Sequence, residues 1–296
     1  YYTRHSASKH KLIWDCATHL IAVTNKSKLG MIEDGIPAEK ITVIPTGFDI
    51  QEFANLRSSR VSHLKQKYLH SDGLKQRQPI IGVAARYVKW KGIEFVIRAF
   101  KQVLAKHPQA LLLLSGSHID RSVVHAKIQA ASQNDIVAPQ YEDVLSIFEC
   151  LDELPDESYL EIPFEDDLYS LFKLFDVFVH APIDSVQETF GQVYVEAMLS
   201  GIPSVITLSG SALDHAVHRE NAWVVDYMSS DQIAEGILAL LSDQALRHKI
   251  SATAFECAKE RYCIEKQTRK LEEFYLKALS SSKNTAKDLQ PLAAGP

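Results

Sequence analysis

The sequence lacks the features typical of membrane-spanning, disulfide-rich and nucleic-acid-binding proteins. Its longest apolar runs, such as residues 110–114, are far too short to cross a bilayer. Its four cysteines include no CxxC pair and no cluster with histidine at metal-ligand spacing, which favours buried or inert thiols. The net charge is −5 with no basic block to offset it, which argues against nucleic acid as the main partner. No GxGxxG follows a predicted strand, which disfavours a Rossmann-type dehydrogenase.

What the sequence does contain is an alternation of short apolar runs and amphipathic segments, which predicts an α/β fold. The content of 46% hydrophobic and 23% charged residues over 296 positions is that of one large globular domain plus part of another. The continuous apolar run 79–84 is typical of a central parallel strand covered on both faces. Further strands are expected at residues 20–24, 41–44, 111–115, 159–162, 176–181, 202–208 and 222–226.

Helices are expected between these strands, at residues 25–34, 60–69, 92–106, 166–175, 190–199, 230–242, 243–262 and 264–279. Residues 142–167 carry many acidic side chains and no Lys or Arg, so we expect a solvated helical insertion there. The acidic residues do not have EF-hand spacing, which disfavours a calcium site.

The segment 182–205 predicts a ligand site at a β-loop-α-β unit. Glu188 lies in the loop before the helix, Gly191 at its start and Glu196 inside it. The free N–H groups of the first helical turn attract anions, and glycine there lets a ligand approach the backbone. Two interpretations stay open: the carboxylates recognise hydroxyls on either side of a diphosphate, or Glu188 caps the helix dipole and Glu196 is solvated.

Two cations follow the apolar run 79–84, and they predict the second half of the same site. Ligands of open α/β sheets gather beyond the carboxyl ends of the strands, so Arg86 and Lys91 point to the crevice that holds Glu188. Arg offers a planar fork and Lys a point charge, and both suit diphosphate oxygens. The alternative is a pair of surface cations.

These motifs together resemble the retaining glycosyltransferases of family 4, the glycosyl transferases group 1, which have the GT-B fold. The resemblance rests on Glu188-x7-Glu196 with Phe190-Gly191 between them, on Ala197-Met198, Gly201 and Pro203, and on Arg86-x4-Lys91-Gly92. It implies one complete Rossmann-like, doubly wound parallel-sheet domain and the C-terminal part of a second Rossmann-like domain.

The resemblance also implies a role for each matching residue. Glu188, Arg86 and Lys91 would be catalytic, as would His5, because Thr3-Arg4-His5 resembles the strand end that carries an active-site histidine. The alternative for His5 is a solvated histidine near a chain end. The expected donor-binding residues are Gly116, Phe190, Gly191, Gln192, Glu196 and Gly210. Ser209 and Asp214 depart from the family's glycine and glutamate, and Thr46 stands where asparagine is commoner.

The resemblance divides the chain into four parts. Residues 1–46 would be a remnant of the acceptor-binding domain, and the missing initial methionine suggests that more of it lies upstream. Residues 47–262 would form the nucleotide-sugar-binding domain, 263–280 a helix crossing back to the first domain, and 281–296 a disordered tail.

The implied activity is transfer of a sugar from a UDP-, GDP- or ADP-linked donor to a glycan or glycolipid acceptor, such as a lipopolysaccharide or capsule precursor. No cofactor and no metal is expected. The implied location is cytoplasmic, with peripheral association at the inner membrane face. The alternative is a non-catalytic nucleotide-sugar-binding module, which the altered loop from Ser209 to Asp214 motivates.

Overall fold

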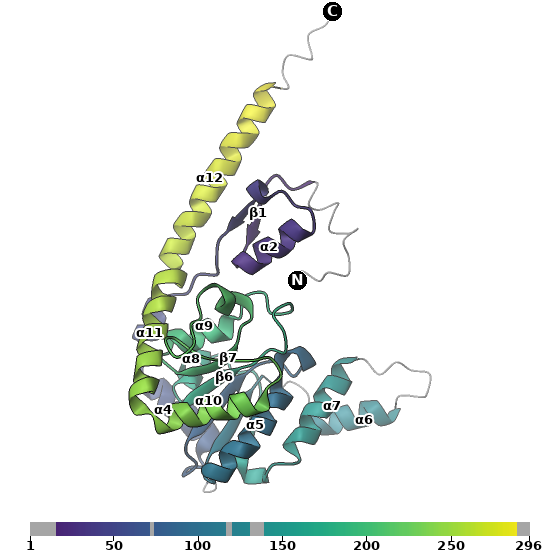
Figure 1. Cartoon of the computed structure of the whole chain (residues 1–296), viewed down its shortest axis with the longest axis vertical. Coiled ribbons are helices and arrows are strands. Elements are labelled where there is room, and N and C mark those ends of the chain that lie inside the picture. Colours follow the sequence, from purple (N-terminus) through teal and green to yellow (C-terminus); the bar gives the residue numbers. More distant parts are fainter. Residues whose placement is uncertain (1–15, 72–73, 117–119, 131–138, 289–296) are drawn as a thin grey trace, which may run out of the picture.

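The computed structural model describes residues 16–71, 74–116, 120–130 and 139–288. The chain forms a large unit around a six-stranded sheet and a small unit around a two-stranded sheet, and the long helix α12 (Ile264–Asp288) runs from the first past the second (Figure 1). None of the helices in the described part of the chain is long and apolar enough to cross a membrane.

The six-stranded sheet is parallel throughout and has the order β5-β4-β3-β6-β7-β8. Its strands are β3 (Ile80–Ala84), β4 (Leu111–Ser115), β5 (Tyr159–Ile162), β6 (Val177–His180), β7 (Ser204–Thr207) and β8 (Trp223–Val225). The predicted doubly wound parallel sheet is therefore confirmed. The chain adds strands outward from β3 in one direction and from β6 in the other, so the order reverses between these neighbours. Such a switch point opens a crevice at the carboxyl ends of the strands.

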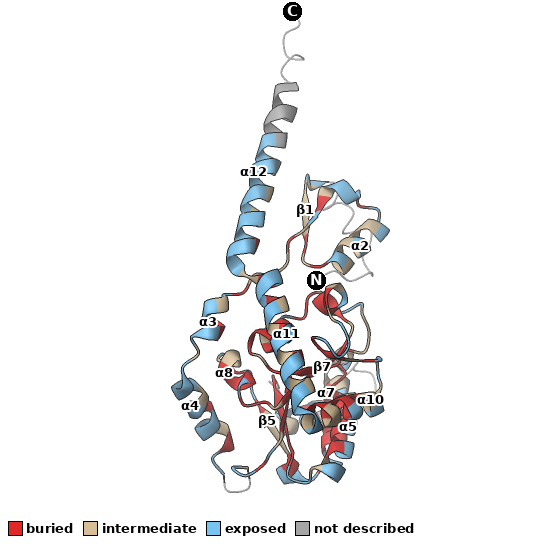
Figure 2. Cartoon of the chain, turned by 60° about the vertical axis from the view of Figure 1, so that its left-hand side comes forward, coloured by how far each residue is buried: buried red, intermediate tan, exposed pale blue. Residues whose placement is uncertain are grey.

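Helices cover both faces of this sheet, because alternate residues of each buried strand point to opposite sides. Ile81 of β3 packs into the core cluster with helices α5 (Ile93–Lys106), α7 (Pro139–Leu151) and α10 (Ser230–Ser242). Its neighbour Ile80 packs into the opposite cluster with α4 (Ser58–Leu69) and α8 (Leu168–Phe172). On that second side α9 (Gln192–Leu199) packs against α11 (Gln244–Tyr262). Figure 2 shows the buried residues concentrated between these helices and the strands.

The small unit pairs β1 (Leu20–Ala22) with β2 (Ile41–Val43) in parallel, and α2 (Asn25–Glu33) and the turn η2 (Ala38–Lys40) join them. The side chain of Thr24 caps α2 by accepting a hydrogen bond from Ser27 N. The ring of Phe274 in α12 lies against that of His19, with 5.8 Å between centroids. The last helix of the described chain therefore packs on its first unit.

The chain passes between the two units at two adjacent places. Phe48 N donates to Tyr262 O at 2.7 Å, and Ile264 N donates to Phe48 O at 2.9 Å. Gly47 fits beside this crossing because a side chain there would come within 2.9 Å of Ile264 Cα. The two crossings are therefore held together by backbone hydrogen bonds.

Several sequence expectations need correction. The acidic segment is not a solvated insertion, because Val144, Ile147 and Phe148 of α7 are buried in the main core and only the opposite face of the helix is polar. A short helix α3 (Ile50–Ala54), which Asp49 caps, precedes α4 where the sequence predicted no helix. Helix α12 extends to Asp288, past the expected end at Leu279 into part of the expected tail.

Candidate functional site

Lys91 and Glu188 meet at the switch point between β3 and β6. The loop after β3 carries Lys91 and the loop after β6 carries Glu188, and Lys91 Nζ lies 2.5 Å from Glu188 Oε2. The two side chains are only 12% and 10% exposed. A desolvated ion pair needs close geometry to offset the cost of taking both charges out of water. The structure therefore brings together the cationic and acidic motifs that the sequence predicted in one crevice.

A glycine makes this close approach possible. Gly92 has φ +68°, and a side chain there would place its Cβ 2.0 Å from Ala181 O on the other loop. The backbone of the two loops is also linked directly, since Ile183 N donates to Trp90 O at 3.0 Å. Any larger residue at position 92 would push the loops apart and separate the ion pair.

Burial acts against both charges of the pair, and the contact between them favours both. Burial lowers the pKa of Lys91, the contact with Glu188 opposes this, and the nearby charge of exposed Arg86 lowers it further. Burial raises the pKa of Glu188, but the contacts with His180 and Lys91 outweigh this and bring it to about 2. Lys91, which feels the positive charge of Arg86, thus lies next to a carboxylate that is held in its charged form.

His180 completes this cluster, although it belongs to none of the predicted motifs. It is the last residue of β6, it is 5% exposed, and its Nε2 lies 3.4 Å from Glu188 Oε2. Burial is the main cause of its lowered pKa, so the imidazole is neutral at neutral pH. The available signal was a histidine that ends an otherwise apolar strand just before the loop of the acidic motif.

Helix α9 begins directly beside Glu188 and supplies free backbone donors. Its N-cap is Gly191, at φ +79°, and no side chain accepts from the first turn. A Cβ at Gly191 would lie 3.6 Å from both Glu188 Cγ and His180 Nε2. The backbone of Gly191 therefore lies beside these two side chains. Gln192, the first helical residue, is exposed. Helix N-termini of this kind attract phosphate and other anions.

Phe190 holds the start of the helix in place. Its ring is buried and packs against Tyr262, with 5.5 Å between centroids, and against Phe48, with 6.3 Å. Its carbonyl accepts a hydrogen bond from Ser211 N at 2.8 Å. The aromatic side chain is thus a core anchor, and only the backbone of Phe190 remains for ligand contact.

Glu196 lies inside α9 in a different environment from Glu188. Its Oε2 is buried and has no hydrogen-bond partner among the described residues, and burial raises its pKa to about 7. The charge of Glu196 helps to raise the pKa of Tyr169 to about 12, after the larger effect of burial. Glu196 is therefore an unpaired carboxylate, which contradicts the alternative that it is simply solvated.

Two further glycines of the predicted site allow close backbone contacts at the same edge of the sheet. Gly116, at φ +114°, would place a Cβ 2.5 Å from Ala85 O at the end of β3. Gly210, at φ +53°, would place one 2.6 Å from Phe190 O and 3.0 Å from Glu188 Cγ. Gly210 thus packs against the site, whereas Asp214 in the same short 3₁₀ helix binds the small unit, because its Oδ2 accepts from Asn25 N at 3.0 Å.

The small unit touches the loop that carries Glu188. Thr24 Oγ1 donates to Thr189 O at 3.3 Å, and Thr24 is 1% exposed. Together with the bond from Asn25 to Asp214, this contact places the start of α2 against the edge of the crevice. His5, the fourth residue expected to be catalytic, lies outside the described residues.

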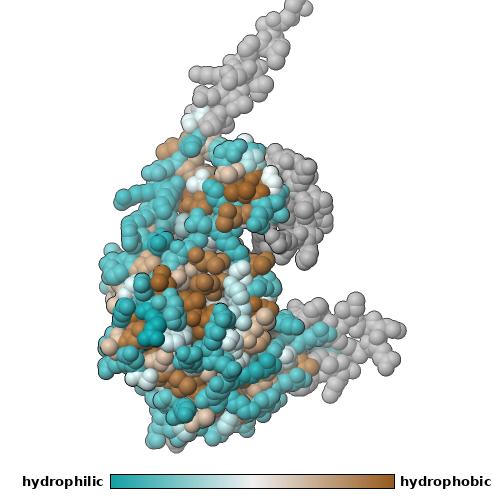
Figure 3. Space-filling view, viewed as in Figure 1, coloured by the Kyte–Doolittle hydropathy of each residue, from teal (hydrophilic) through white to brown (hydrophobic). Residues whose placement is uncertain are grey.

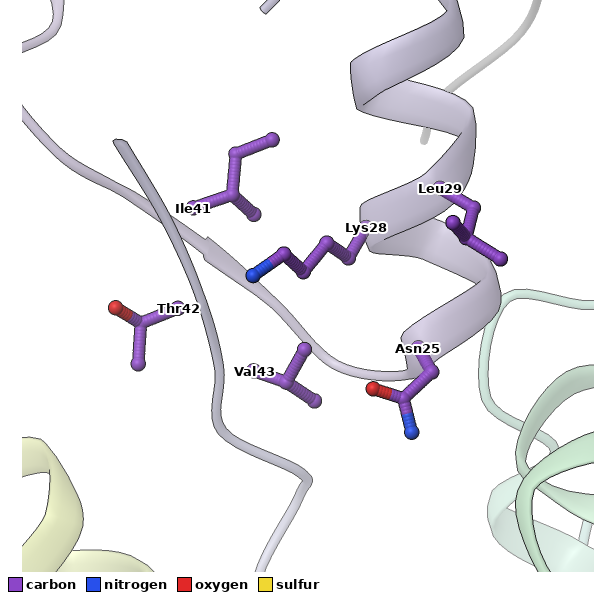
Figure 4. Close-up of a pocket in the computed structure, with 6 residues that line it drawn as sticks. All are labelled: Asn25, Lys28, Leu29, Ile41, Thr42 and Val43. Carbon is purple, nitrogen blue, oxygen red and sulfur yellow. The ribbon is translucent and has the colours of Figure 1, made fainter. Parts of the chain in front are cut away.

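Two surface hollows are separate from the pair of Lys91 and Glu188. One, of about 500 Å³, is on the small unit, where the Lys28 amine extends across the strand residues Ile41 to Val43 (Figure 4). Apolar side chains also gather on the visible surface of this unit (Figure 3), and Leu29 of α2 is 58% exposed. The other, of about 640 Å³, lies between α11 and the amino ends of β6 and β7. Neither includes Lys91 or Glu188.

Comparisons with known proteins find similarity to glycosyltransferases. Residues 157–256 match the family described as glycosyl transferases group 1. The capsular polysaccharide biosynthesis glycosyltransferase CapM of Staphylococcus aureus is 26% identical over 92% of this chain and 65% of its own length. The uncharacterized glycosyltransferase MJ1607 of Methanocaldococcus jannaschii is 28% identical over 76% of this chain and 51% of its own length. The chain thus spans between half and two thirds of these curated relatives.

Solved structures show the same fold. The crystal structure of Anabaena HepE in complex with UDP and glucose superposes with a TM-score of 0.72, at 23% identity, over 91% of this chain and 67% of that one. The C-terminal domain of the glycosyl transferase group 1 family protein LpcC from Francisella tularensis is 25% identical, with a TM-score of 0.54, and 74% of this chain covers all of it. The GT-B fold that the motifs implied is therefore confirmed.

Proposed function

Starting from the match of residues 157–256 to the glycosyl transferases of group 1, we propose that the chain belongs to this family and transfers a sugar from a nucleoside-diphosphate donor to an acceptor. The observation that carries the proposal is the buried contact between Lys91 and Glu188 at the switch point, next to the uncapped start of α9. Cationic, anionic and backbone donor groups therefore lie together there, and these are the groups that bind a sugar diphosphate. The alternative of a non-catalytic module is not favoured, because both curated relatives described above carry a glycosyltransferase's name.

Departure of the diphosphate is the step for which these residues are suited. Lys91 and Arg86 provide two positive charges, and the first turn of α9 provides backbone N–H groups, for the charge that grows on the leaving phosphate. In this proposal they take the role that a metal ion has in other transferases, so the reaction is metal-independent. Holding donor and acceptor in line supplies much of the remaining acceleration.

The two carboxylates bind opposite ends of the donor in this scheme. Glu188 accepts hydrogen bonds from hydroxyls of the sugar, and its charge assists an oxocarbenium-like transition state without attacking it. Glu196 accepts from the ribose, which would give its buried Oε2 the partner that it lacks among the described residues. Gly191 and the backbone of Phe190 complete the sugar site, and transfer proceeds with retention at the anomeric carbon.

We propose UDP-sugars as the first donors to test, because HepE, which shares the fold, was crystallised with UDP and glucose. The name of CapM supports a capsule precursor or a related glycan or glycolipid as the acceptor. A cytoplasmic location close to a membrane that carries such acceptors belongs to the same proposal.

The test is a thermal-shift and calorimetry panel of UDP-, GDP- and ADP-sugars, followed by a donor-hydrolysis assay with the donor that binds best. We expect one class of nucleotide to bind and its sugar to be released, and Lys91→Ala to lose both effects. Lys89→Ala is the matched control, because Lys89 is an exposed cation in the same short 3₁₀ helix. Binding without release would favour the non-catalytic module, and no binding at all would contradict the proposal.

A further inference from the structure

His180 presents a buried ring nitrogen to the site and has no hydrogen bond to satisfy it. Nε2 is fully enclosed and has no hydrogen-bond partner among the described residues. Glu188 Oε2 lies 3.4 Å from it, too poorly aligned with the ring N–H for an ordinary hydrogen bond. The ring is stacked on Phe178, with 6.4 Å between centroids and 10° between planes, which fixes its orientation. A buried polar atom without a partner in a rigid setting calls for a functional explanation.

His180 and Lys91 approach the same oxygen of Glu188. Lys91 Nζ lies 2.5 Å and His180 Nε2 3.4 Å from Oε2, which leaves Oε1 as the oxygen that can accept from a ligand. Under the proposed function, Lys91 also has to bind the diphosphate. A diphosphate carries more negative charge than one carboxylate, so it competes for the Lys91 amine. Glu188, buried and ionised, then needs another donor, because an unpaired buried charge is costly.

We propose that His180 is this donor: a positioning residue that gives its Nε2 proton to Glu188 Oε2 and holds the carboxylate in place while Lys91 binds the diphosphate. The inference rests on the proposed function and assigns a role that none of the residues matched to the family motifs fills. Glu188 then presents Oε1 to the sugar in a fixed direction throughout the reaction. A shift of a few tenths of an ångström, in which the carboxylate of Glu188 turns Oε2 into line with the ring N–H, completes this hydrogen bond.

A neutral donor suits this position better than a cation. Burial lowers the pKa of His180, so the ring supplies an N–H without a second charge at neutral pH. A charged residue at position 180 would compete with Lys91 and Arg86 for the diphosphate and would itself be costly to bury. Neutral His180 can hold Glu188 without drawing the leaving group away from its cations.

The kinetic test compares two substitutions in the full chain. His180→Phe keeps the flat ring against Phe178 but removes the nitrogen, and His180→Gln places an amide N–H close to the position of Nε2. We expect His180→Phe to lower kcat for donor hydrolysis by about 30-fold while KM and nucleotide affinity change less than about threefold. We expect His180→Gln to recover at least about a third of the lost rate. Melting temperatures check that both variants fold.

A purely structural histidine would give a different result. Phenylalanine would then serve as well as or better than glutamine, because it preserves the packing in an apolar strand. Equal kcat values for His180→Phe and the unaltered chain, or a lower rate for His180→Gln than for His180→Phe, would overturn the proposal. Loss of nucleotide affinity in step with kcat would also overturn it, because positioning Glu188 acts on the sugar and not on the nucleotide.

A second measurement does not depend on turnover. Nitrogen-15 NMR of the histidine rings distinguishes the two neutral tautomers, and the proposal requires His180 to carry its proton on Nε2. The Nε2 signal should shift in Glu188→Gln and stay unchanged in Gln187→Ala, an exposed neighbour in the same loop. A proton on Nδ1 would overturn the inference. If no sugar nucleotide is cleaved but the Nε2 tautomer is present and responds to Glu188→Gln, the contact stands and the proposed function fails.

Discussion

Two carboxylates lie on either side of the start of helix α9, and their pKa values are shifted in opposite directions. Glu188, in the loop before the helix, has a lysine at 2.5 Å, and its contacts lower its pKa to about 2. Glu196, within the helix, has no ion-pair partner among the described residues, and burial raises its pKa to about 7. The two residues belong to one sequence motif and are both largely buried, so their neighbours alone account for the difference.

This contrast assigns the two carboxylates different tasks. A paired carboxylate is held in one charge state and one direction, which suits a group that must orient a reacting sugar. An unpaired one is stable as a neutral acid and becomes a strong acceptor only when a ligand supplies donors, which suits a group that binds a hydroxyl pair such as that of ribose. The same contrast arranges the predictions that follow, from the largest expected effect to the smallest.

Glu188→Ala should have the largest effect on turnover. We expect donor cleavage to fall by at least about 1,000-fold, because the sugar loses its orienting acceptor and the transition state loses a nearby negative charge. Nucleotide affinity should stay within about threefold of the original value, since the nucleotide contacts other groups. Stopped assays of donor cleavage together with calorimetry measure both quantities, and Gln187→Ala is the control. Unchanged turnover would contradict the assignment of Glu188.

Lys91→Ala should affect binding and turnover together. We expect kcat/KM to fall by about 100-fold, because the diphosphate loses a cation in both the ground state and the transition state. Nucleotide affinity should fall as well, in contrast to Glu188→Ala, and Lys89→Ala should change neither quantity. The same two assays measure the effect. A variant that loses turnover but binds the nucleotide with full affinity would show that Lys91 does not contact the diphosphate.

The two carboxylates should make opposite contributions to stability as pH changes. Glu188 has a lowered pKa, so the stability that it contributes is present above about pH 4.5 and is lost as the pH falls toward 2. Glu196 has a raised pKa, so it costs no stability below about pH 4.5; its cost builds up as the pH rises from about 4.5 to 7 and is constant above that. Each effect is on the order of 3 kcal/mol, at 1.36 kcal/mol per pKa unit.

Urea unfolding at pH 3, 5 and 8 measures these contributions. We expect Glu188→Gln to be less stable than the unaltered chain at pH 8, with the difference shrinking toward pH 3, because the buried Lys91 loses its partner. Glu196→Gln should instead be more stable at pH 8 and nearly equal at pH 5. If both substitutions shift stability in the same direction at pH 8, the contrast between the two sites is wrong.

The smallest effect concerns nucleotide affinity at Glu196. Ribose hydroxyls donate hydrogen bonds, so they bind the ionised carboxylate, and a pKa of about 7 means that much of Glu196 is protonated at pH 6. Nucleotide affinity should rise by about tenfold from pH 6 to pH 8 and then level off, because binding requires Glu196 to lose its proton. Calorimetry over this range with a nucleoside diphosphate measures it. In Glu196→Gln the rise should disappear, and a rise that persists there would assign it to another group.

Much of the fold was predictable because buried parallel strands leave a strong mark in a sequence. The continuous apolar run ending at Ala84 could only be covered on both faces, and β4 and β5 have the predicted bounds. Helix ends were less predictable, because α9 begins where Gly191 adopts a positive φ and not where the apolar spacing begins. The burial of α7 was not predicted, because its many acidic residues indicated a solvated helix although its apolar residues lie on one buried face.

The site was predictable to the extent that its residues lie beside glycines and strand ends. Lys91 and Glu188 stood out because each follows an apolar strand in a recognisable motif, and their distance apart is now known. His180 was missed because a single histidine at the end of a buried strand is usually a core residue. The contacts of Thr24 and Asp214 join segments 165 and 189 positions apart in the sequence, and nothing local marks them.

The chain passes between the two units near Phe48 and again near Tyr262, and this limits how the units can move against each other. Because α12 packs beside the small unit, that unit is assembled from the first and last segments of the described chain, and the larger sheet is inserted between them. Two adjacent chain segments join the units, so one unit can rotate against the other about these segments more easily than it can move away. We therefore expect a fluorophore pair on α12 and α4 to report any swing of one unit against the other, whereas a pair on α12 and α2 keeps a constant distance and calibrates it.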